Sequence, residues 1–295
     1  MDGVLLVDKP AGPTSHDVVA SLRRLTGERK LGHTGTLDPI ATGLLVLCFG
    51  AATKAIPYLP EGDKTYAVEA ELGAATDTQD RTGRITAENR DFSLAHADLL
   101  GILAGFVGPG TQLPPMYSAV QVGGERLYRL ARAGCEVERE ARPVEIASLR
   151  LDWPSAAEKP FFTRGDRIRF TVRGSRGLYV RTLCHDLGQR AGCLAHLCEL
   201  RRLASGPFSL DEAVPLAELT REGVAARLWP IGRALAHLPE LRLCAEDAAR
   251  VSHGGMLAAG AAPGRDLVRA VDPRGETFAV LARRGGLWRP ERVFK

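Results

Sequence analysis

Residues 65–72 alternate with a period of two, and this pattern constrains the fold more than any other in the chain. It places Tyr66, Val68, Ala70 and Leu72 on one face of a β-strand, because successive strand side chains point to opposite sides. The chain therefore contains a sheet with an apolar face. Further strands are predicted at residues 4–7, 44–49, 117–122, 144–151 and 167–172.

Helical patterns lie between these strands. Thr14 or Ser15 can cap a helix that ends at Gly27, where helices commonly place a glycine. Its apolar face consists of Val18, Val19, Leu22 and Leu25. Further helices are predicted at 51–59, 94–106, 125–133 and from 178 toward Gly192, and the spacing of Leu194, Leu197 and Cys198 continues a helical core face. Segments 73–84 and 108–115 are predicted to be loops, so strands and helices together indicate an α/β body.

The composition changes at residue 238. From there the chain is rich in glycine, and short strands are predicted at 267–271, 278–282 and 288–294, with turns between them. Short strands at this spacing favour a small β-barrel attached to the α/β body. A chain of 295 residues is long enough for two domains, which we place at 1–237 and 238–295.

Composition and charge limit the function classes. Apolar residues make up 45% and charged residues 25%, which is typical of globular proteins. The start of the chain lacks a signal-peptide pattern and no run of 18 apolar residues occurs, so we expect a cytoplasmic protein. Six arginines against one acid lie in 163–181, and another basic segment spans 265–295. These segments either follow a phosphate backbone or form solvated strand faces.

The six cysteines include no CxxC pair and are expected to be reduced and buried. Five residues that can ligate zinc lie within 15 positions: Cys184, His185, Cys193, His196 and Cys198. Their spacing fits none of the usual structural zinc patterns, so we expect no metal.

The segment 32–39 holds an isolated acid, Asp38, in a loop that contains Gly32 and Gly35. Pro39 biases Asp38 toward extended geometry, and the glycines allow the backbone to lie close to a ligand. The loop is either an ordinary turn or a device that presents a carboxylate outward.

The motifs of the whole chain, taken in order, resemble the TruB family of bacterial tRNA pseudouridine-55 synthases. The matching segments are 8–15, 32–45, 52–54, 64–66, 76–80, 115–119, 179–183 and 200–203. The resemblance implies a catalytic α/β (α+β) domain with a mixed, largely antiparallel sheet flanked by helices, and a C-terminal PUA-like RNA-binding barrel. It also implies a monomer without cofactor or metal that isomerises a uridine of the tRNA T loop to pseudouridine.

The resemblance assigns the catalytic roles to Asp38, Tyr66 and Arg181. Breaking a glycosidic bond without water needs an anionic group near the sugar, and Asp38 would act there as a nucleophile at C1′ or as a base at C2′. Arg181 would keep that carboxylate ionised, because a nearby cation opposes the effect of burial on its pKa. Tyr66 would stack on the target uracil.

The substrate-binding roles also follow from the resemblance. His33 would fill the space that the flipped uridine leaves, and extrusion of that base costs a few kcal/mol. Lys54 would contact phosphate or support the Asp38 loop, and Leu200 would form an apolar pocket wall. The matching motifs add Gly35, Thr36 and Tyr179 to the substrate-binding set.

Two other classes of function stay open at this point. One is a non-catalytic RNA-binding or RNA-folding protein on the same scaffold. The other is an aspartate-dependent nucleoside hydrolase, which needs a second carboxylate to activate water, and Asp77 and Asp80 are the nearby candidates.

Overall fold

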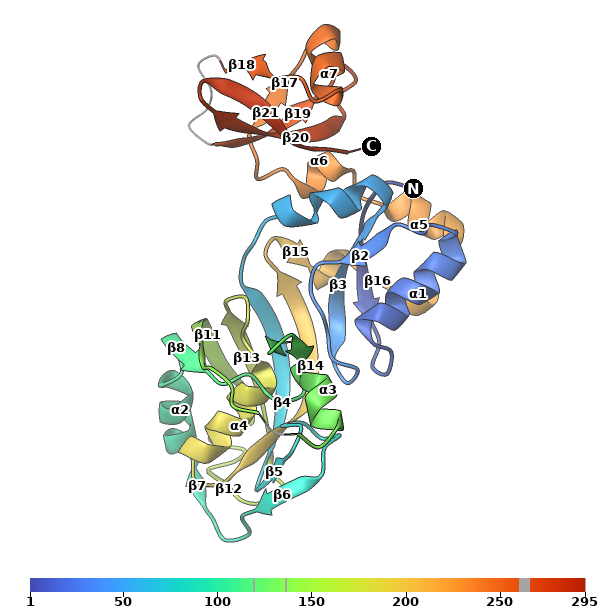
Figure 1. Ribbon diagram of the computed structural model, residues 1–295. Coiled ribbons are helices and arrows are strands. Elements are labelled where there is room, and N and C mark those ends of the chain that lie inside the picture. The colour runs from blue at the N-terminus through green and yellow to red at the C-terminus, as the bar shows by residue number, and fades with distance from the viewer. Residues whose placement is uncertain (119, 136, 260–265, 295) are drawn as a thin grey trace. The chain divides into compact units, whose positions relative to one another are not determined.

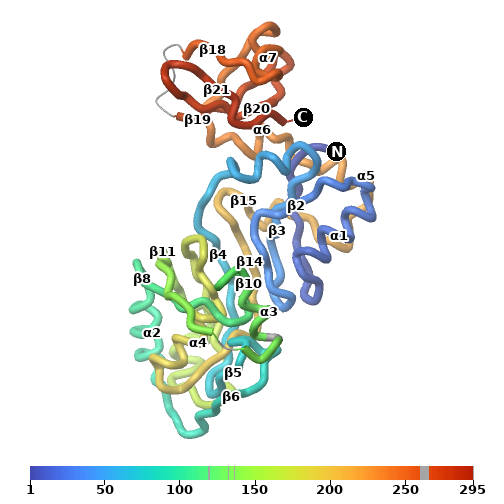
Figure 2. Tube along the Cα trace, viewed as in Figure 1, coloured from blue at the N-terminus to red at the C-terminus, as the bar shows by residue number. Residues whose placement is uncertain are grey.

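A computed structural model describes residues 1–118, 120–135, 137–259 and 266–294. Its contacts divide the chain into two units, of which the first joins Met1–Glu61 to Pro207–Lys295 and the second is Gly62–Gly206 (Figures 1 and 2). The predicted domain boundary at residue 238 stays a prediction. No helix in the described ranges has the length and apolar character needed to cross a membrane.

The first unit begins with strands β1 (Gly3–Lys9), β2 (Leu31–His33) and β3 (Thr42–Phe49), and β3 pairs antiparallel with both β1 and β2. Helix α1 (Ser15–Thr26) connects β1 to β2 and is capped by Thr14 and Gly27, as predicted. Its residues Val18, Val19 and Leu22 pack on β1 and β3 in one core, whereas Leu25 is exposed. The helix therefore buries three of its four predicted apolar residues.

The chain re-enters this unit after residue 206. It forms β15 (Phe208–Ser209), β16 (Val214–Pro215), which runs parallel to β1, and the short helices η2 (Leu210–Glu212), η3 (Leu216–Glu218), α5 (Arg221–Arg227) and α6 (Ile231–Ala234). The segment after β3 is a 3₁₀-helix, η1 (Gly50–Tyr58), where sequence predicted a helix at 51–59.

A curled five-stranded sheet follows at the C-terminal end (Figure 1). Its order is β17 (Glu240–Arg242), β19 (Leu267–Val271), β20 (Thr277–Arg284), β21 (Leu287–Val293) and β18 (Leu257–Ala258), with helix α7 (Ala245–Ser252). It has its own apolar core, which includes Val268, Leu281 and Trp288. The three predicted strands are confirmed, and the curled half-barrel is consistent with the predicted PUA-like module.

In the second unit, β4 (Lys64–Leu72) lies between β13 (Arg167–Gly174) and β14 (Ala195–Ser205), antiparallel to both. Strands β11 (Arg142–Trp153) and β8 (Gly108–Gln112) extend the sheet beyond β13. Tyr66, Val68, Ala70 and Leu72 are all buried, which confirms the predicted face. All these pairings are antiparallel and the pairing of β1 with β16 is parallel, so the strand pairing is mixed and largely antiparallel, as the resemblance implied.

Helix α4 (Val180–Arg190) packs against β14 and β4, and α2 (His96–Ala104) packs against α4 and β11. The remaining elements are small hairpins and one short helix. They comprise β5 (Ala74–Thr76) with β6 (Ile85–Glu88), β7 (Leu94–Ala95) with β12 (Phe161–Phe162), β9 (Gln121–Val122) with β10 (Glu125–Arg126), and α3 (Leu127–Arg132).

Several predicted elements were wrong. The segment 194–198 enters strand β14 and is not helical. The prediction failed because four consecutive residues from Ala195 to Cys198 are buried, and a buried run of this kind fits a strand as well as a helix. Part of the predicted 108–115 loop forms β8. Of the predicted strand 117–122 only residues 121–122 are extended in a sheet, and Ala119 lies outside the described residues.

Candidate active site

Asp38 lies in the loop between β2 and β3, and its side chain is half-buried. The Ala41 N–H donates to the Asp38 carbonyl at 3.0 Å, so residues 38–41 form a turn around Pro39. The preceding Leu37 is 4% exposed and anchors the loop in the protein. The acid is therefore held by a turn on one side and a buried residue on the other.

Helix α1 fixes the loop through Ser15. This fully buried side chain accepts a hydrogen bond from the Leu37 N–H at 2.9 Å and donates to the Leu37 carbonyl at 3.3 Å. One hydroxyl thus satisfies both backbone polar groups of Leu37, the residue before Asp38, in a buried place where a missing partner is costly. Sequence reasoning used Ser15 only as a candidate helix cap and did not find this role.

The turn at residues 10–13 fixes the other side of the loop. The Gly12 N–H donates to the Pro39 carbonyl at 2.8 Å, and Gly12 has φ 106°, which favours glycine. The fully buried Lys9 donates to the carbonyls of Pro10 and Pro13 at 2.9 and 2.8 Å. The matching motif at 8–15 therefore supports the Asp38 loop.

The other predicted residues of the first unit lie before, within and after the Asp38 loop. His33 ends β2 and meets His16 edge to face, with ring centroids 5.3 Å apart. Gly35 is half-buried and Thr36 exposed in the loop, and Lys54 is half-buried on η1. The predicted set in this unit is thus carried by β2, the loop after it and η1.

Arg181 belongs to the second unit, in the first turn of α4, and is 5% exposed. Its guanidinium donates to the carbonyls of Thr78 at 3.0 Å and Tyr117 at 2.7 Å. Its Nη1 also lies 3.9 Å from Oδ2 of the buried Asp80. Several fixed groups therefore hold this planar cation in one orientation.

The segment 76–80 lies in the predicted loop 73–84, and it is more ordered than a solvated turn. Asp80 is 5% exposed, and its Oδ1 accepts hydrogen bonds from the Thr82 N–H, the Thr82 hydroxyl and the Thr78 hydroxyl at 2.6–2.9 Å. Gln79 accepts from the Thr182 hydroxyl of α4 at 3.0 Å. The segment is an ordered support for the start of α4.

Three further predicted residues lie around β4. Tyr66 is 7% exposed and pairs with Val172 on β13 and Arg202 on β14. Leu200 is 8% exposed opposite Val68, two residues from Tyr66 on the same face. Tyr179 precedes α4, and its N–H donates to Gln112 Oε1 at 3.0 Å. The structure thus carries the nine predicted residues as two groups, one in each unit.

The basic segment 163–181 proves to be of two kinds. Four of its arginines pair with carboxylates and form a charged strand face: Arg164, Arg167, Arg169 and Arg173. Arg176 lies near Lys64 and the buried Arg202. Burial is the main cause that lowers the pKa of Lys64 to about 8, and the charges of Arg202 and Arg176 contribute less. Such a concentration of positive charge is complementary to an anion.

The cysteines are all free, and four of the six are buried, as expected for the reduced state. Cys135 and Cys244 are exposed, which corrects the prediction for these two. Burial raises the pKa of the Cys193 thiol to about 11, so this thiol is unreactive at neutral pH. Cys198 and His196 lie on β14, outside the helix that was predicted to carry them.

Three family descriptions match almost the whole chain. They are "TruB family pseudouridylate synthase (N terminal domain)" at residues 23–180, "tRNA pseudouridylate synthase B C-terminal domain" at 181–230, and "tRNA Pseudouridine synthase II, C terminal" at 238–295. All three name pseudouridine synthases, which is the class that the sequence and the fold define.

Similar proteins agree with that class. The tRNA pseudouridine synthase B of Geobacter sulfurreducens is 48% identical over 86% of this chain and 82% of its own length, and that of Geobacillus thermodenitrificans is 43% identical over 100% of both. The chain belongs to the TruB family of pseudouridylate synthases, which confirms the predicted resemblance.

Solved structures with the same fold include a chain in the crystal structure of a Cbf5–Nop10–Gar1 complex. That chain has a TM-score of 0.71 and 26% identity over 99% of this chain and 85% of its own. A structure of an H/ACA RNP bound to a substrate RNA containing 2′-deoxyuridine gives the same TM-score at 24% identity, over 99% and 85%, and this likeness shows the fold alone.

Proposed function

We propose that this protein is a tRNA pseudouridine synthase that isomerises the uridine at position 55 in the T loop to pseudouridine. Family membership over almost the whole chain carries the proposal, since relatives at 39–48% identity bear the name tRNA pseudouridine synthase B. The motifs that hold Asp38, Tyr66 and Arg181 are intact in this sequence. We also propose that the protein works in the cytoplasm, on tRNA, and as a monomer.

The reaction breaks the N1–C1′ bond of the uridine and forms a C5–C1′ bond. The uracil turns between the two steps, N1 gains a proton, and the proton on C5 is lost. We assign the required carboxylate to Asp38, either as the nucleophile at C1′ or as the base that removes a proton from C2′. The two supports of its loop, at Leu37 and at Pro39, favour this role because catalysis needs a positioned group.

Arg181 and Tyr66 take the supporting roles that the family pattern gives them. Arg181 would keep Asp38 ionised under bound RNA, and its rigid set of hydrogen bonds to Thr78 and Tyr117 suits a residue with a fixed direction. Tyr66 would stack on the flipped uracil, with Leu200 beside it on the same face of the sheet. His33 would occupy the space that the uridine leaves.

Binding to RNA is supported by the half-buried Lys64, which lies near the exposed Arg176 and the charge of the buried Arg202. Positive charge that is partly withdrawn from water gains most from a phosphate group, and such contacts supply much of the affinity of RNA-binding proteins. Lys54 is a second candidate for a phosphate contact.

The alternative of a nucleoside hydrolase finds no support in the two candidate acids. Asp80 is buried, and one of its oxygens already accepts three hydrogen bonds. Asp77 is exposed and accepts a hydrogen bond from the Arg84 N–H at 2.9 Å, which closes a turn. Both acids therefore serve structure.

Tritium at uracil C5 of unmodified tRNA tests the proposal. Isomerisation releases tritium without free uracil, hydrolysis releases free uracil, and a purely RNA-binding protein does neither. Asp38→Asn is expected to abolish tritium release and to keep most of the RNA affinity, because phosphate contacts dominate that affinity. Full turnover by Asp38→Asn would refute the assignment, and tRNA that carries another base in place of the target uridine is the control for position.

A further inference from the structure

Three metal-binding side chains of different chemistry meet on the second unit, outside every residue assigned to the reaction. They are Glu71 on β4 and His196 and Cys198 on β14, and their ligand atoms all lie within 4.8 Å of one another. Cys198 Sγ is 3.9 Å from His196 Nε2 and 3.9 Å from Glu71 Oε2. Separations of this size allow one ion to contact all three atoms after small side-chain movements.

The pairing of the two strands produces this cluster. His196 lies directly opposite Glu71, so their side chains share one face of the sheet. Two steps along β14, from Leu197 to Glu199, match one step along β4, and Cys198 is the extra residue of this bulge. Bulges redirect side chains and are common at functional sites. Here the bulge brings a thiol beside the paired histidine and carboxylate.

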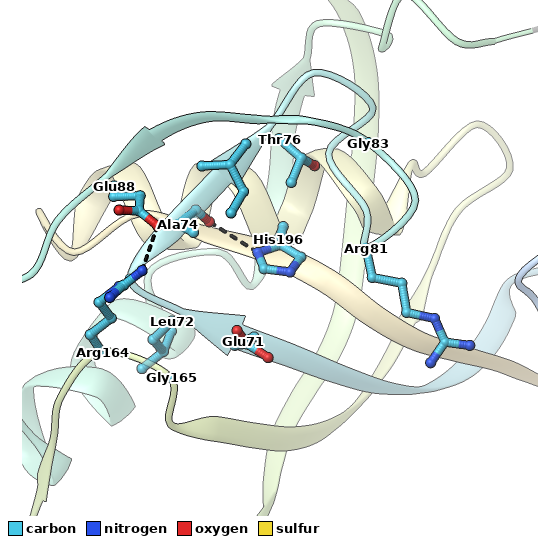
Figure 3. A pocket seen from close by; sticks show the side chains of 12 residues that line it. Glu71, Leu72, Ala74, Thr76, Arg81, Gly83, Glu88, Arg164, Gly165 and His196 are labelled. Carbon is cyan, nitrogen blue, oxygen red and sulfur yellow. Dashed lines mark hydrogen bonds and ion pairs between the residues drawn. The ribbon is translucent and has the colours of Figure 1, made fainter.

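The hydrogen bond of His196 fixes which of its nitrogens faces the cluster. Nδ1 lies 3.1 Å from the Ala74 carbonyl, and because a carbonyl only accepts, Nδ1 carries the proton. Figure 3 shows this bond and the imidazole directed into a pocket that Glu71 also lines. In the neutral ring, Nε2 then presents a lone pair toward a carboxylate and a sulfur. Metal-bound histidines are held in this manner by a backbone carbonyl.

The ion pair between Arg167 and Glu71 does not prevent a metal ion from binding to Glu71. Arg167 Nε lies 3.2 Å from Glu71 Oε2, but Arg167 Nη1 also pairs with Glu69 Oε1 at 2.9 Å. Arg167 would therefore keep Glu69 Oε1 as a partner if Glu71 turned one oxygen toward a metal ion, while Glu69 Oε2 pairs with Arg169. The Glu71 carboxylate has two oxygens and can serve both Arg167 and the ion.

The geometry points to a zinc site made by Glu71, His196 and Cys198, with water as the fourth ligand. A nitrogen, a thiolate and a carboxylate together suit Zn²⁺, which prefers four ligands in a tetrahedron. The pocket of about 380 Å³ that Glu71 and His196 line gives the ion an entry route and gives the water its place.

The proposed ion would act on structure. Side chains alternate along β4, so Glu71 faces the side of the sheet opposite to Tyr66. An ion bound there joins β4 to β14 at the bulge, where the hydrogen-bond ladder is interrupted. We expect it to stabilise the protein and to leave the reaction itself unchanged, so the proposal stands or falls separately from the proposed function.

Cobalt binding tests the site, with the exposed thiols removed by Cys135→Ser and Cys244→Ser. Metal-stripped protein is expected to bind one equivalent of Co²⁺ with a thiolate charge-transfer band, which Zn²⁺ then abolishes. Cys198→Ser should lose the band, and Cys193→Ser, which changes another buried thiol outside the cluster, should keep it. Loss of a supporting residue weakens metal sites about 10–100-fold, so loss of a direct ligand should weaken this one by more than about 100-fold.

A second measurement does not depend on the folding of any variant. Zn²⁺ should raise the unfolding temperature of the stripped protein with its natural cysteines and should slow alkylation of Cys198 relative to the exposed Cys135, as peptide mapping would show. The proposal is overturned if no band forms, if the band survives Cys198→Ser or if it is lost in Cys193→Ser. Equal alkylation of Cys198 with and without Zn²⁺ would also overturn it.

Discussion

Ser15→Ala tests whether helix α1 positions the catalytic loop. The substitution leaves the Leu37 N–H without its 2.9 Å acceptor in a buried place, which costs about 1–3 kcal/mol of stability. Alanine at the first position of α1 offsets about 0.5 kcal/mol through its higher helix propensity. We therefore expect a net loss of about 0.5–2.5 kcal/mol in the free energy of unfolding, measured by urea denaturation.

The same change should lower the rate of the reaction much more than RNA binding. Leu37 is bonded directly to Asp38, and a displacement of about 1 Å at a catalytic group costs on the order of 100-fold in rate. The phosphate contacts are not touched, so the affinity for tRNA should stay the same. Single-turnover tritium release and equilibrium binding separate the two quantities.

Thr14→Ala is the matched control. It removes the cap of the same helix at a cost of about 0.5–2 kcal/mol, and it leaves the hydrogen bonds of Ser15 to Leu37 in place. It should therefore lose similar stability with an unchanged single-turnover rate. The reasoning would be refuted if Ser15→Ala reacted as fast as the natural protein. It would also be refuted if Thr14→Ala lost as much of the single-turnover rate as Ser15→Ala.

The remaining predictions concern the second unit. Asp80→Ala should cost about 3 kcal/mol in urea denaturation because it leaves buried donors unpaired, while Asp77→Ala should cost less than about 1 kcal/mol. Gly188→Ala should destabilise strongly because a Cβ there would lie 2.1 Å from the Ala195 nitrogen, whereas Gly101→Ala meets open space on α2 and should stabilise by about 0.5–1 kcal/mol. Bound phosphate favours protonated Lys64, whose pKa in the free protein is about 8, so RNA binding above that pH takes up a proton. The affinity for RNA should therefore fall between about pH 7 and about pH 9.5. Lys64→Met should make the affinity less dependent on pH.

Patterns that depend on neighbours in sequence were sufficient to predict most of the elements around the site. The alternation at 65–72 gave β4 and its buried face, and the Thr14 and Gly27 signals gave both ends of α1. These features are local, because capping and strand alternation act over a few residues. The segment 194–198 failed because it is buried on both sides, and burial on both sides removes the periodicity that distinguishes a strand from a helix.

The supports of the proposed catalytic residues were out of reach for the opposite reason. Ser15 and Leu37 are 22 residues apart, and Arg181 reaches Thr78 across 103 residues. When only the neighbouring sequence is known, polar residues such as Ser15 and Thr78 are equally compatible with a solvated turn. The motif match marked both segments without explaining them, and the fold supplies the explanation: each holds in place a residue that the family pattern assigns to chemistry.

The proposed zinc site shows the same limit of sequence-based prediction. Spacing along the chain excluded the usual zinc patterns for the cysteines and histidines at 184–198, and that argument holds only for ligands that come from one local segment. Glu71 enters from β4, more than a hundred residues earlier in the chain, through strand pairing that places it opposite His196. A set of ligands that comes from two strands follows no spacing rule along the chain. The proposed metal site at Cys198 therefore follows from the register of β4 and β14, and no sequence motif predicts it.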